Sequence, residues 1–285
     1  MGIFKSCQLI LLSLILLTAC SPERKLAKKF VKEDKPGAVM LITPAMVYKN
    51  SFKIPYVENF ESLPQETKDS ISFFNSDVVQ FCDDSTYINN FLEGLNRGFR
   101  FFGLQVYHGN DASDFLNNGK ESYIFNFAQI QLEEFLDSIS EQTSYDSSAA
   151  NTEAIFVTAV NMNNWIEITK LNHVKSEPTM LFSSQMITDD FNGHFIYYPL
   201  TGEFDYQYTV DSLTVDKLYN SARTLGFRHA QWLFDYLLND YILKNMPEGK
   251  LREKMFSYDF EYRILKKLKY QPFEEIPEND TLSVN

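Results

Sequence analysis

The sequence has few of the residues and motifs that usually carry chemistry. It holds three cysteines and four histidines in 285 residues. The motifs Gly-x-Ser-x-Gly, the P-loop and the dinucleotide fingerprint are absent. No two histidines are spaced to form a metal-ligand pair on one element: they are His108, His173, His194 and His229. We therefore expect no metal, no cofactor and no catalysis of the kinds that these motifs mark.

Basic residues are also scarce. Lys and Arg total 26 against 38 for Asp and Glu, which gives a formal net charge of −12. Nucleic-acid binding needs a basic face that neutralises phosphates, so from this balance we expect no nucleic-acid partner. At 44% hydrophobic and 15% aromatic residues, the chain is not globally disordered. Its length suits one large domain or two small ones, with a core that needs no disulfide or metal.

The N-terminus has an apolar run that is too short to span a membrane, which takes about 20 residues. The run extends from Leu9 to Ala19 and follows Lys5, the only charged residue before position 23. A basic flank before a run of this length is typical of a signal peptide. We therefore expect residues 1–19 to be removed.

The run ends in Leu17-Thr18-Ala19-Cys20, which resembles the lipobox of bacterial lipoproteins. The resemblance covers residues 1–20 and implies cleavage after Ala19 and acylation of Cys20. Two or three acyl chains anchor a protein on a bilayer more stably than one chain does. By the same resemblance, Ser21 rather than Asp after the cysteine implies an outer-membrane location. The run Ser21-Pro22-Glu23-Arg24-Lys25 holds a single acidic residue, whereas surface-exported lipoproteins carry an acidic run there, so we expect the periplasmic face. The alternative is an ordinary secretory signal that happens to contain a cysteine.

Only Cys20 and Cys82 remain after residues 1–19 are removed. Because Cys20 would carry lipid, no intramolecular disulfide can form. We expect Cys82 to be a buried, reduced thiol beside Phe81. The alternative is an exposed thiol that pairs between chains.

The mature chain divides by composition into three parts. Residues 20–36 hold the lipidated cysteine and a basic tether, with six cationic against three acidic residues. Cations beside an anionic bilayer contribute about 1 kcal/mol each, and the alternative is a plain solvated linker. Residues 37–270 are expected to form one mixed α/β domain, and residues 271–285 an acidic, flexible tail.

The first half of the domain shows alternating strands and helices. Its apolar periodicity predicts strands over 38–43, 104–107 and 122–133 and helices over 84–102 and 111–118. Strands joined by helical crossovers pair in parallel. We therefore expect a sheet that begins with parallel neighbours.

The second half begins with closely spaced strands, which pair antiparallel. They are predicted over 154–162, 165–171, 179–188, 195–198 and 204–209, with Asn192-Gly193 as a hairpin turn. A long helix over 215–245 and a further helix or mixed element over 250–269 follow. The expected fold is α/β: one mixed sheet, parallel early and antiparallel later, with amphipathic helices packed on it.

One group of histidine and carboxylate residues lies close together in the sequence. His108, Asp111 and Asp114 follow a predicted strand, where the sites of α/β proteins often lie. The alternative is a turn at Gly109-Asn110 followed by a helix capped by Asp111. His229 lies in an apolar helical stripe beside Trp232, so we interpret it as a core residue rather than a general base.

Aromatic residues crowd the stretch from 195 to 208. Phe204, Tyr206 and Tyr208 alternate along one predicted strand and therefore share a face. Such a ladder is suited to stacking on sugars or to burying the surface of a partner. The alternative is cross-strand packing within a hairpin.

The order of the elements resembles that of the curli-secretion and penicillin-binding-protein-activator lipoproteins. The shared features are a lipidated cysteine, a strand over residues 39–43 that ends at Pro44, an amphipathic helix and alternating strands. The resemblance implies a periplasmic binding or assembly module without catalysis, and it assigns no functional residue.

We therefore expect a non-catalytic lipoprotein of the bacterial cell envelope, held on the bilayer by acylated Cys20. Its partner would be an envelope protein or a glycan. One alternative is an envelope hydrolase of glycans or peptides that uses His108, Asp111 and Asp114. The other is a surface lipoprotein that binds glycans through the aromatic ladder.

Overall fold

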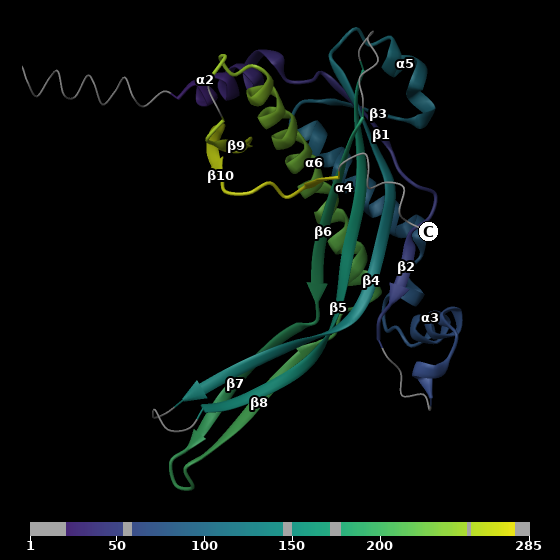
Figure 1. The fold of residues 1–285 in the computed structure, drawn as a ribbon, viewed down its shortest axis with the longest axis vertical. Helices are drawn as coiled ribbons and strands as arrows, with labels where there is room; N and C mark the ends of the chain where they lie inside the picture. Colours follow the sequence, from purple (N-terminus) through teal and green to yellow (C-terminus); the bar gives the residue numbers. More distant parts are fainter. Residues whose placement is uncertain (1–20, 54–58, 145–149, 172–177, 250–251, 277–285) are drawn as a thin grey trace, which may run out of the picture.

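The computed structural model describes residues 21–53, 59–144, 150–171, 178–249 and 252–276. Helices pack on a twisted sheet, and a narrow arm of strands projects from one end of this body (Figure 1). The sheet has seven strands in the order β11-β6-β5-β4-β1-β3, with β2 also paired to β4. Its strands are β1 (Ala38–Ile42), β2 (Tyr48–Ser51), β3 (Gln105–His108), β4 (Ser122–Ser144), β5 (Ala150–Leu171), β6 (Thr179–Thr188) and β11 (Glu274–Ile276).

The sheet changes from parallel to antiparallel pairing along the chain. β1 pairs in parallel with both β3 and β4. The connection from β1 to β3 includes α3 (Gln65–Phe74) and α4 (Asp84–Phe101), and the connection from β3 to β4 includes α5 (Ala112–Leu116). The pairs β4–β5, β5–β6 and β6–β11 are antiparallel. The predicted α/β fold with a mixed sheet is therefore confirmed.

The core lies between the sheet and two long helices, α4 and α6 (Val215–Lys244). On α4 the apolar residues recur every four positions, which places them on one face. Phe99 of this face stacks on Phe125 of β4 with ring centroids 5.4 Å apart, and Phe91 meets Phe127 edge-on at 5.1 Å. The predicted helices over 84–102 and 215–245 are confirmed to within one residue at each end.

α4 and α6 approach each other closely because glycines lie where they cross. A Cβ atom on Gly94 would be 2.0 Å from the carbonyl oxygen of Arg223, and one on Gly226 would be 2.0 Å from that of Phe91. A Cβ atom on Gly98 would be 2.5 Å from that of Ala230. Any larger residue at Gly94 or Gly226 would therefore force the two helix backbones apart.

Residues 22–34, which the composition assigned to a tether, are helical and docked on the body. α2 (Pro22–Lys29) continues into the π-helical turn η1 (Phe30–Asp34). Ala27 is fully buried, and the ring of Phe30 packs 5.6 Å from that of Phe234 on α6. The prediction of a tether is therefore wrong for these residues, because their apolar side chains pack against the body.

The C-terminal region also differs from its prediction. Residues 255–268 form a hairpin of β9 (Met255–Asp259) and β10 (Ile264–Leu268), not a helix. Asn239 of α6 holds this hairpin, because its amide bonds to the backbone N–H and C=O of Phe256 at 2.9 and 2.7 Å. β11 adds an edge strand to β6, and Phe273 is buried, so residues 273–276 are not a flexible tail. Residues 277–285 lie outside the described part of the chain.

The predicted strands of the second half are longer and more continuous than expected. β5 joins the segments 154–162 and 165–171, while β6 has the predicted bounds. Asn192-Gly193 is not a turn, because it lies inside β7 (Asp190–Tyr198). A Cβ atom on Gly193 would be 2.0 Å from the Tyr206 hydroxyl, so this glycine provides space for a ring on β8 (Glu203–Asp211). The turn lies instead at 199–202, where Gly202 has a φ of +75°.

Candidate binding site

The arm begins where β4 and β5 extend beyond their neighbours. β2 pairs with β4 as far as Glu134, and β6 pairs with β5 from Ala159 onward. Beyond these points, residues 135–144 and 150–158 pair only with each other among the described residues. Nine or ten residues at about 3.3 Å each make a ribbon about 30 Å long. This ribbon is the first half of the arm.

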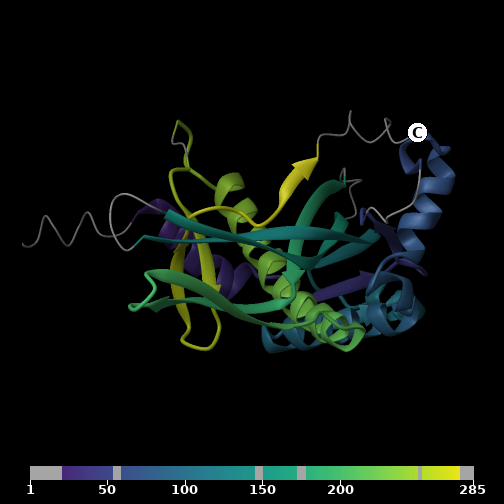
Figure 2. The same ribbon diagram turned by 90° about the horizontal axis from the view of Figure 1, so that it is seen from below.

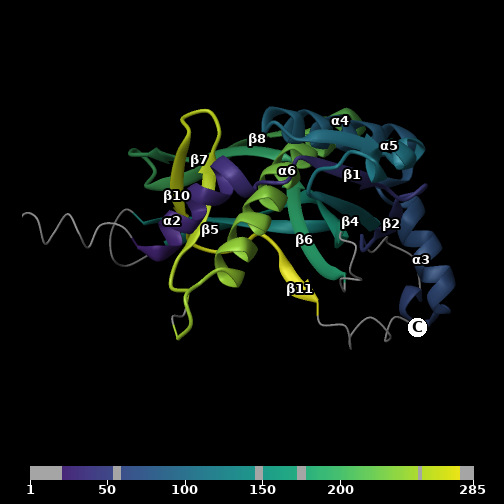
Figure 3. The same ribbon diagram turned by 90° about the horizontal axis from the view of Figure 1, so that it is seen from above.

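The second half of the arm is the β7–β8 ribbon, which leaves the sheet at Asp189. The Asp189 carboxylate accepts hydrogen bonds from the backbone N–H groups of Thr158 at 2.7 Å and Leu213 at 2.6 Å. Among the described residues, β7 and β8 pair only with each other. Figures 2 and 3 show this ribbon running beside the β4–β5 ribbon. We define the arm as residues 135–144, 150–158 and 190–211.

A buried ion pair fastens the arm to the body. The fully buried Glu134 carboxylate accepts hydrogen bonds from the backbone N–H groups of Asp77 at 2.7 Å, Val78 at 2.9 Å and Val79 at 2.9 Å. The Lys53 ammonium lies 3.1 Å from the same carboxylate. A carboxylate with this many donors is well compensated for its burial.

The same lysine links Glu134 to the neighbouring strand. Its ammonium also donates to Thr158 Oγ1 on β5 at 3.1 Å and to the carboxylate of Asp77. Burial opposes a charged lysine, but hydrogen bonds and charges from Asp77 and Glu134 outweigh burial and raise the Lys53 pKa. We call Lys53, Asp77 and Glu134 the clamp, because they join β4, β5 and the loop after α3 at the base of the arm.

The aromatic ladder predicted from the sequence lies on the arm. Phe204, Tyr206 and Tyr208 share one face of β8, because they pair opposite Tyr197, Phe195 and Gly193 of β7. The rings of Phe195 and Tyr206 are 4.7 Å apart, and those of Tyr197 and Phe204 are 5.0 Å apart. Phe204 and Tyr206 are half-buried, while Tyr208 is 54% exposed. Cross-strand packing therefore occupies much of the ladder.

Tyr206 shows which way the ladder faces. The pKa of Tyr206 is raised to about 12. The largest cause is burial of its hydroxyl, followed by an interaction with Glu141 and by the charges of Glu141 and Glu153. Glu141 belongs to β4 and Glu153 to β5. The ladder therefore faces the other ribbon of the arm, and the two ribbons form two layers.

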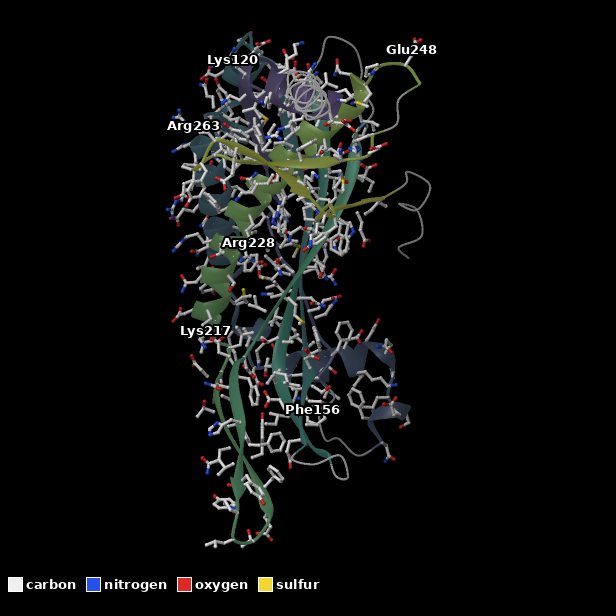
Figure 4. The ribbon with its side chains drawn as sticks, turned by 90° about the vertical axis from the view of Figure 1, so that its left-hand side faces the viewer. Lys120, Phe156, Lys217, Arg228, Glu248 and Arg263 are labelled. Atoms are coloured by element: carbon white, nitrogen blue, oxygen red, sulfur yellow. The ribbon has the colours of Figure 1, made fainter. Side chains whose placement is uncertain are left out.

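Large apolar side chains also point outward from the arm. Phe156 on β5 is 69% exposed, and Leu200 in the β7–β8 turn is fully exposed. Figure 4 shows Phe156 in the arm, beyond the end of α6 that carries Lys217. Further exposed apolar side chains of the arm are Leu136, Tyr198 and Val210. The sequence predicted the ladder but gave no signal for these residues as a group, because they come from separate strands.

The structure places His108, Asp111 and Asp114 at the end of β3, in the turn that follows and at the start of α5. The Asp111 carboxylate accepts a hydrogen bond from the backbone N–H of His108 at 3.1 Å, which is a local capping interaction. Asp111 and Asp114 are exposed, and His108 lines an open hollow along α4. Within the described ranges, no three His, Cys, Asp or Glu residues are grouped to hold a metal ion.

His229 and Cys82 are core residues. His229 is fully buried, with Nδ1 2.9 Å from the Leu225 carbonyl oxygen and Nε2 2.7 Å from Ser183 Oγ. Burial lowers its pKa to about 4, so the ring is neutral. Cys82 is 3% exposed, and burial raises its pKa to about 12. The interpretation of His229 as a core residue and the predicted burial of Cys82 are confirmed.

Cys20 and the predicted signal segment lie outside the described residues. Among the helices that are described, none combines the length and apolar character needed to cross a bilayer. The chain matches no family model, no curated protein and no solved structure.

Proposed function

We propose that this chain is a lipid-anchored lipoprotein of the bacterial cell envelope, and that it is a non-catalytic binding or assembly module. Cys20 carries the acyl chains, and the mature protein lies on the outer membrane facing the periplasm. The arm is the surface through which it engages an envelope partner. No residue is assigned a catalytic role.

The arm is the observation that carries this proposal. Its ribbons have outer edges whose backbone N–H and C=O groups are unpaired within the described chain. Such edges are templates for pairing with a strand of another chain. Exposed Phe156, Leu200 and Tyr208 add apolar surface beside these edges. A partner that adds a strand would cover both features.

The position of the anchor supports the same proposal. α2 begins two residues after Cys20 and lies at the opposite end of the molecule from the tip of the arm (Figure 1). A protein held at this end keeps its arm clear of its own attachment point. The clamp fixes the arm to the body, so its direction is set by the fold.

Site-specific cross-linking in intact cells tests the role of the arm. A photoreactive residue at Phe156 or Leu200 should give a discrete cross-linked product with a second copy or with one envelope protein. Phe74 and Leu116 are exposed residues of the same two types on the body, at 73% and 62%, and serve as controls. Products from the control positions alone would contradict the proposal.

Substitution of Cys20 tests the proposed lipid anchor. The Cys20→Ala protein should remain unprocessed and should not incorporate labelled fatty acid. Normal cleavage after Ala19 with normal labelling would show that the lipoprotein assignment is wrong.

A further inference from the structure

A cationic surface lies at the anchored end of this acidic protein. Residues 21–36 and 252–270 together contain twelve cationic and six acidic residues. These two segments therefore carry +6 in a chain of net charge −12, and the rest of the chain carries −18. Figures 1 and 3 show α2 beside the β9–β10 hairpin, so the two segments form one surface.

Many of these cations are free to meet an external anion. Lys29, Lys32 and Lys266 pair with neighbouring carboxylates. Six others are exposed and have no carboxylate partner in the described chain: Arg24, Lys25, Lys28, Arg263, Lys267 and Lys269. We call these six residues the cationic patch.

Exposed amphipathic side chains accompany the patch. Tyr262 and Tyr270 are 67% and 75% exposed, and Ile264 is 47% exposed. Tyrosine suits the boundary between water and lipid, because its ring is apolar and its hydroxyl is polar. Basic residues combined with exposed rings fit a headgroup layer better than a purely polar partner.

The position of α2 brings this surface to the bilayer. Pro22 is two residues from Cys20, so the helix begins within about 7 Å of the proposed acylated residue. Ala27 and Phe30 dock the helix on the body, so the patch cannot swing away as a flexible tether would. Attachment at Cys20 therefore holds the patch within reach of the lipid headgroups.

We propose that the cationic patch, with Tyr262 and Tyr270, binds the anionic headgroups of the bilayer in which the acyl chains are inserted. The anchor supplies attachment, and the patch fixes the orientation of the body on the membrane. This inference rests on the proposed lipid anchor, but the patch makes its own contacts.

Lysine footprinting on vesicles tests the proposal. The full-length protein is purified, its acylation is measured by intact mass, and it is reconstituted into vesicles of phosphatidylcholine alone or with phosphatidylglycerol. An amine-reactive reagent then labels lysines, and peptide masses give their rates. Lys25, Lys28 and Lys267 should react about threefold or more slowly on the anionic vesicles, and salt at about 0.5 M should remove the difference. Lys68 on α3 and Lys217 at the start of α6 lie toward the arm rather than at the anchored end (Figures 1 and 4), and they should not change.

Charge reversal supplies the matched comparison. In Lys25→Glu/Lys28→Glu/Lys267→Glu, the one patch lysine that remains, Lys269, should react at the same rate on both kinds of vesicle. The control Arg97→Glu/Arg100→Glu/Arg228→Glu makes the same charge change at exposed positions of α4 and α6 and should keep the difference. Equal rates on both vesicles for the unchanged protein, or loss only in the control, would overturn the proposal.

The intact mass separates this inference from the lipoprotein proposal. If the intact mass shows no acyl chains, the proposed lipid anchor is wrong. The unacylated protein is then mixed directly with the same vesicles. Slower labelling of the patch on anionic vesicles would support the patch without the anchor. Equal labelling would refute both.

Discussion

The body and the arm share the strands β4 and β5 but are stabilised in different ways. In the body, Phe125, Phe127 and Met162 of these strands are buried under α4 and α6. In the arm no helix of the described residues covers the same strands, and alternate residues from Leu136 to Ser140 are exposed. A two-stranded ribbon alone is marginally stable in water. The comparison indicates that the body is stabilised by its own core, while the arm depends on the clamp and on the packing of its two ribbons.

The clamp should give the largest effect. Glu134→Ala leaves Lys53 buried without its buried partner and removes the acceptor of three backbone N–H groups. We expect a loss of about 3–5 kcal/mol in the free energy of unfolding, measured with urea. Glu133→Ala is the control, because Glu133 is only half-buried and bonds to Gln131 and Asn163 instead. Equal midpoints for the two variants would show that the clamp is dispensable.

A substitution at the contact between α4 and α6 should lower the free energy of unfolding almost as much. In Gly226→Ala the new Cβ atom would meet the Phe91 carbonyl oxygen, and backbone cannot move aside as a side chain can. We expect destabilisation of about 3 kcal/mol by thermal or urea unfolding. Gly109→Ala places its Cβ atom in open space and should change stability little. A stable Gly226→Ala protein would mean that the helices pack less closely than described.

The body should also be weakened by acid through His229. Burial lowers its pKa to about 4 in the folded protein, from an ordinary value of 6.5. As the pH falls below 6.5, His229 is protonated in the unfolded chain but stays neutral in the folded protein. The free energy of unfolding therefore decreases until the pH reaches about 4. His229→Gln removes this dependence on pH. The free energy of unfolding of the variant minus that of the wild-type protein should therefore increase by about 2 kcal/mol when the pH is lowered from 7 to 5. Urea unfolding at both pH values measures the difference, and a constant difference would contradict the buried neutral ring.

The arm surface should give the smallest effect on stability and a large effect on assembly. Phe156→Ser changes an exposed side chain, so we expect a change within about 0.5 kcal/mol. The yield of cross-link from Leu200 in cells should nevertheless fall. Phe127→Ala, in the buried part of β4, should cost about 3–5 kcal/mol. An unchanged cross-link yield in Phe156→Ser would remove Phe156 from the binding surface.

Much of the body could be predicted from the sequence, because its elements have clear periodicity. The stripe on α4 and the bounds of β6 are local patterns. α2 was missed because its lysines dominate the composition and hide the apolar spacing of Leu26, Ala27, Phe30 and Val31. Asn192-Gly193 was misread because a glycine that admits a ring from another strand looks the same as one that makes a turn.

The candidate site was predictable only where it is local. Alternation along one strand placed Phe204, Tyr206 and Tyr208 on one face. The clamp joins Lys53 to Glu134, which are 81 positions apart, and no spacing rule links residues at that distance. The arm itself depends on where β2 and β6 stop, which is a property of sheet pairing and not of any single segment.

The continuity of β4 and β5 has a mechanical consequence. Each strand runs without interruption from beneath the helices to the end of the arm, and the one irregularity described in their pairing lies in the body, between Phe127 and Gln129. The pair therefore works as a lever about 30 Å long, whose fulcrum is the clamp. A load applied at the tip is delivered as a torque to the strands that carry Phe125 and Phe127, so pulling on the arm strains the core of the body directly.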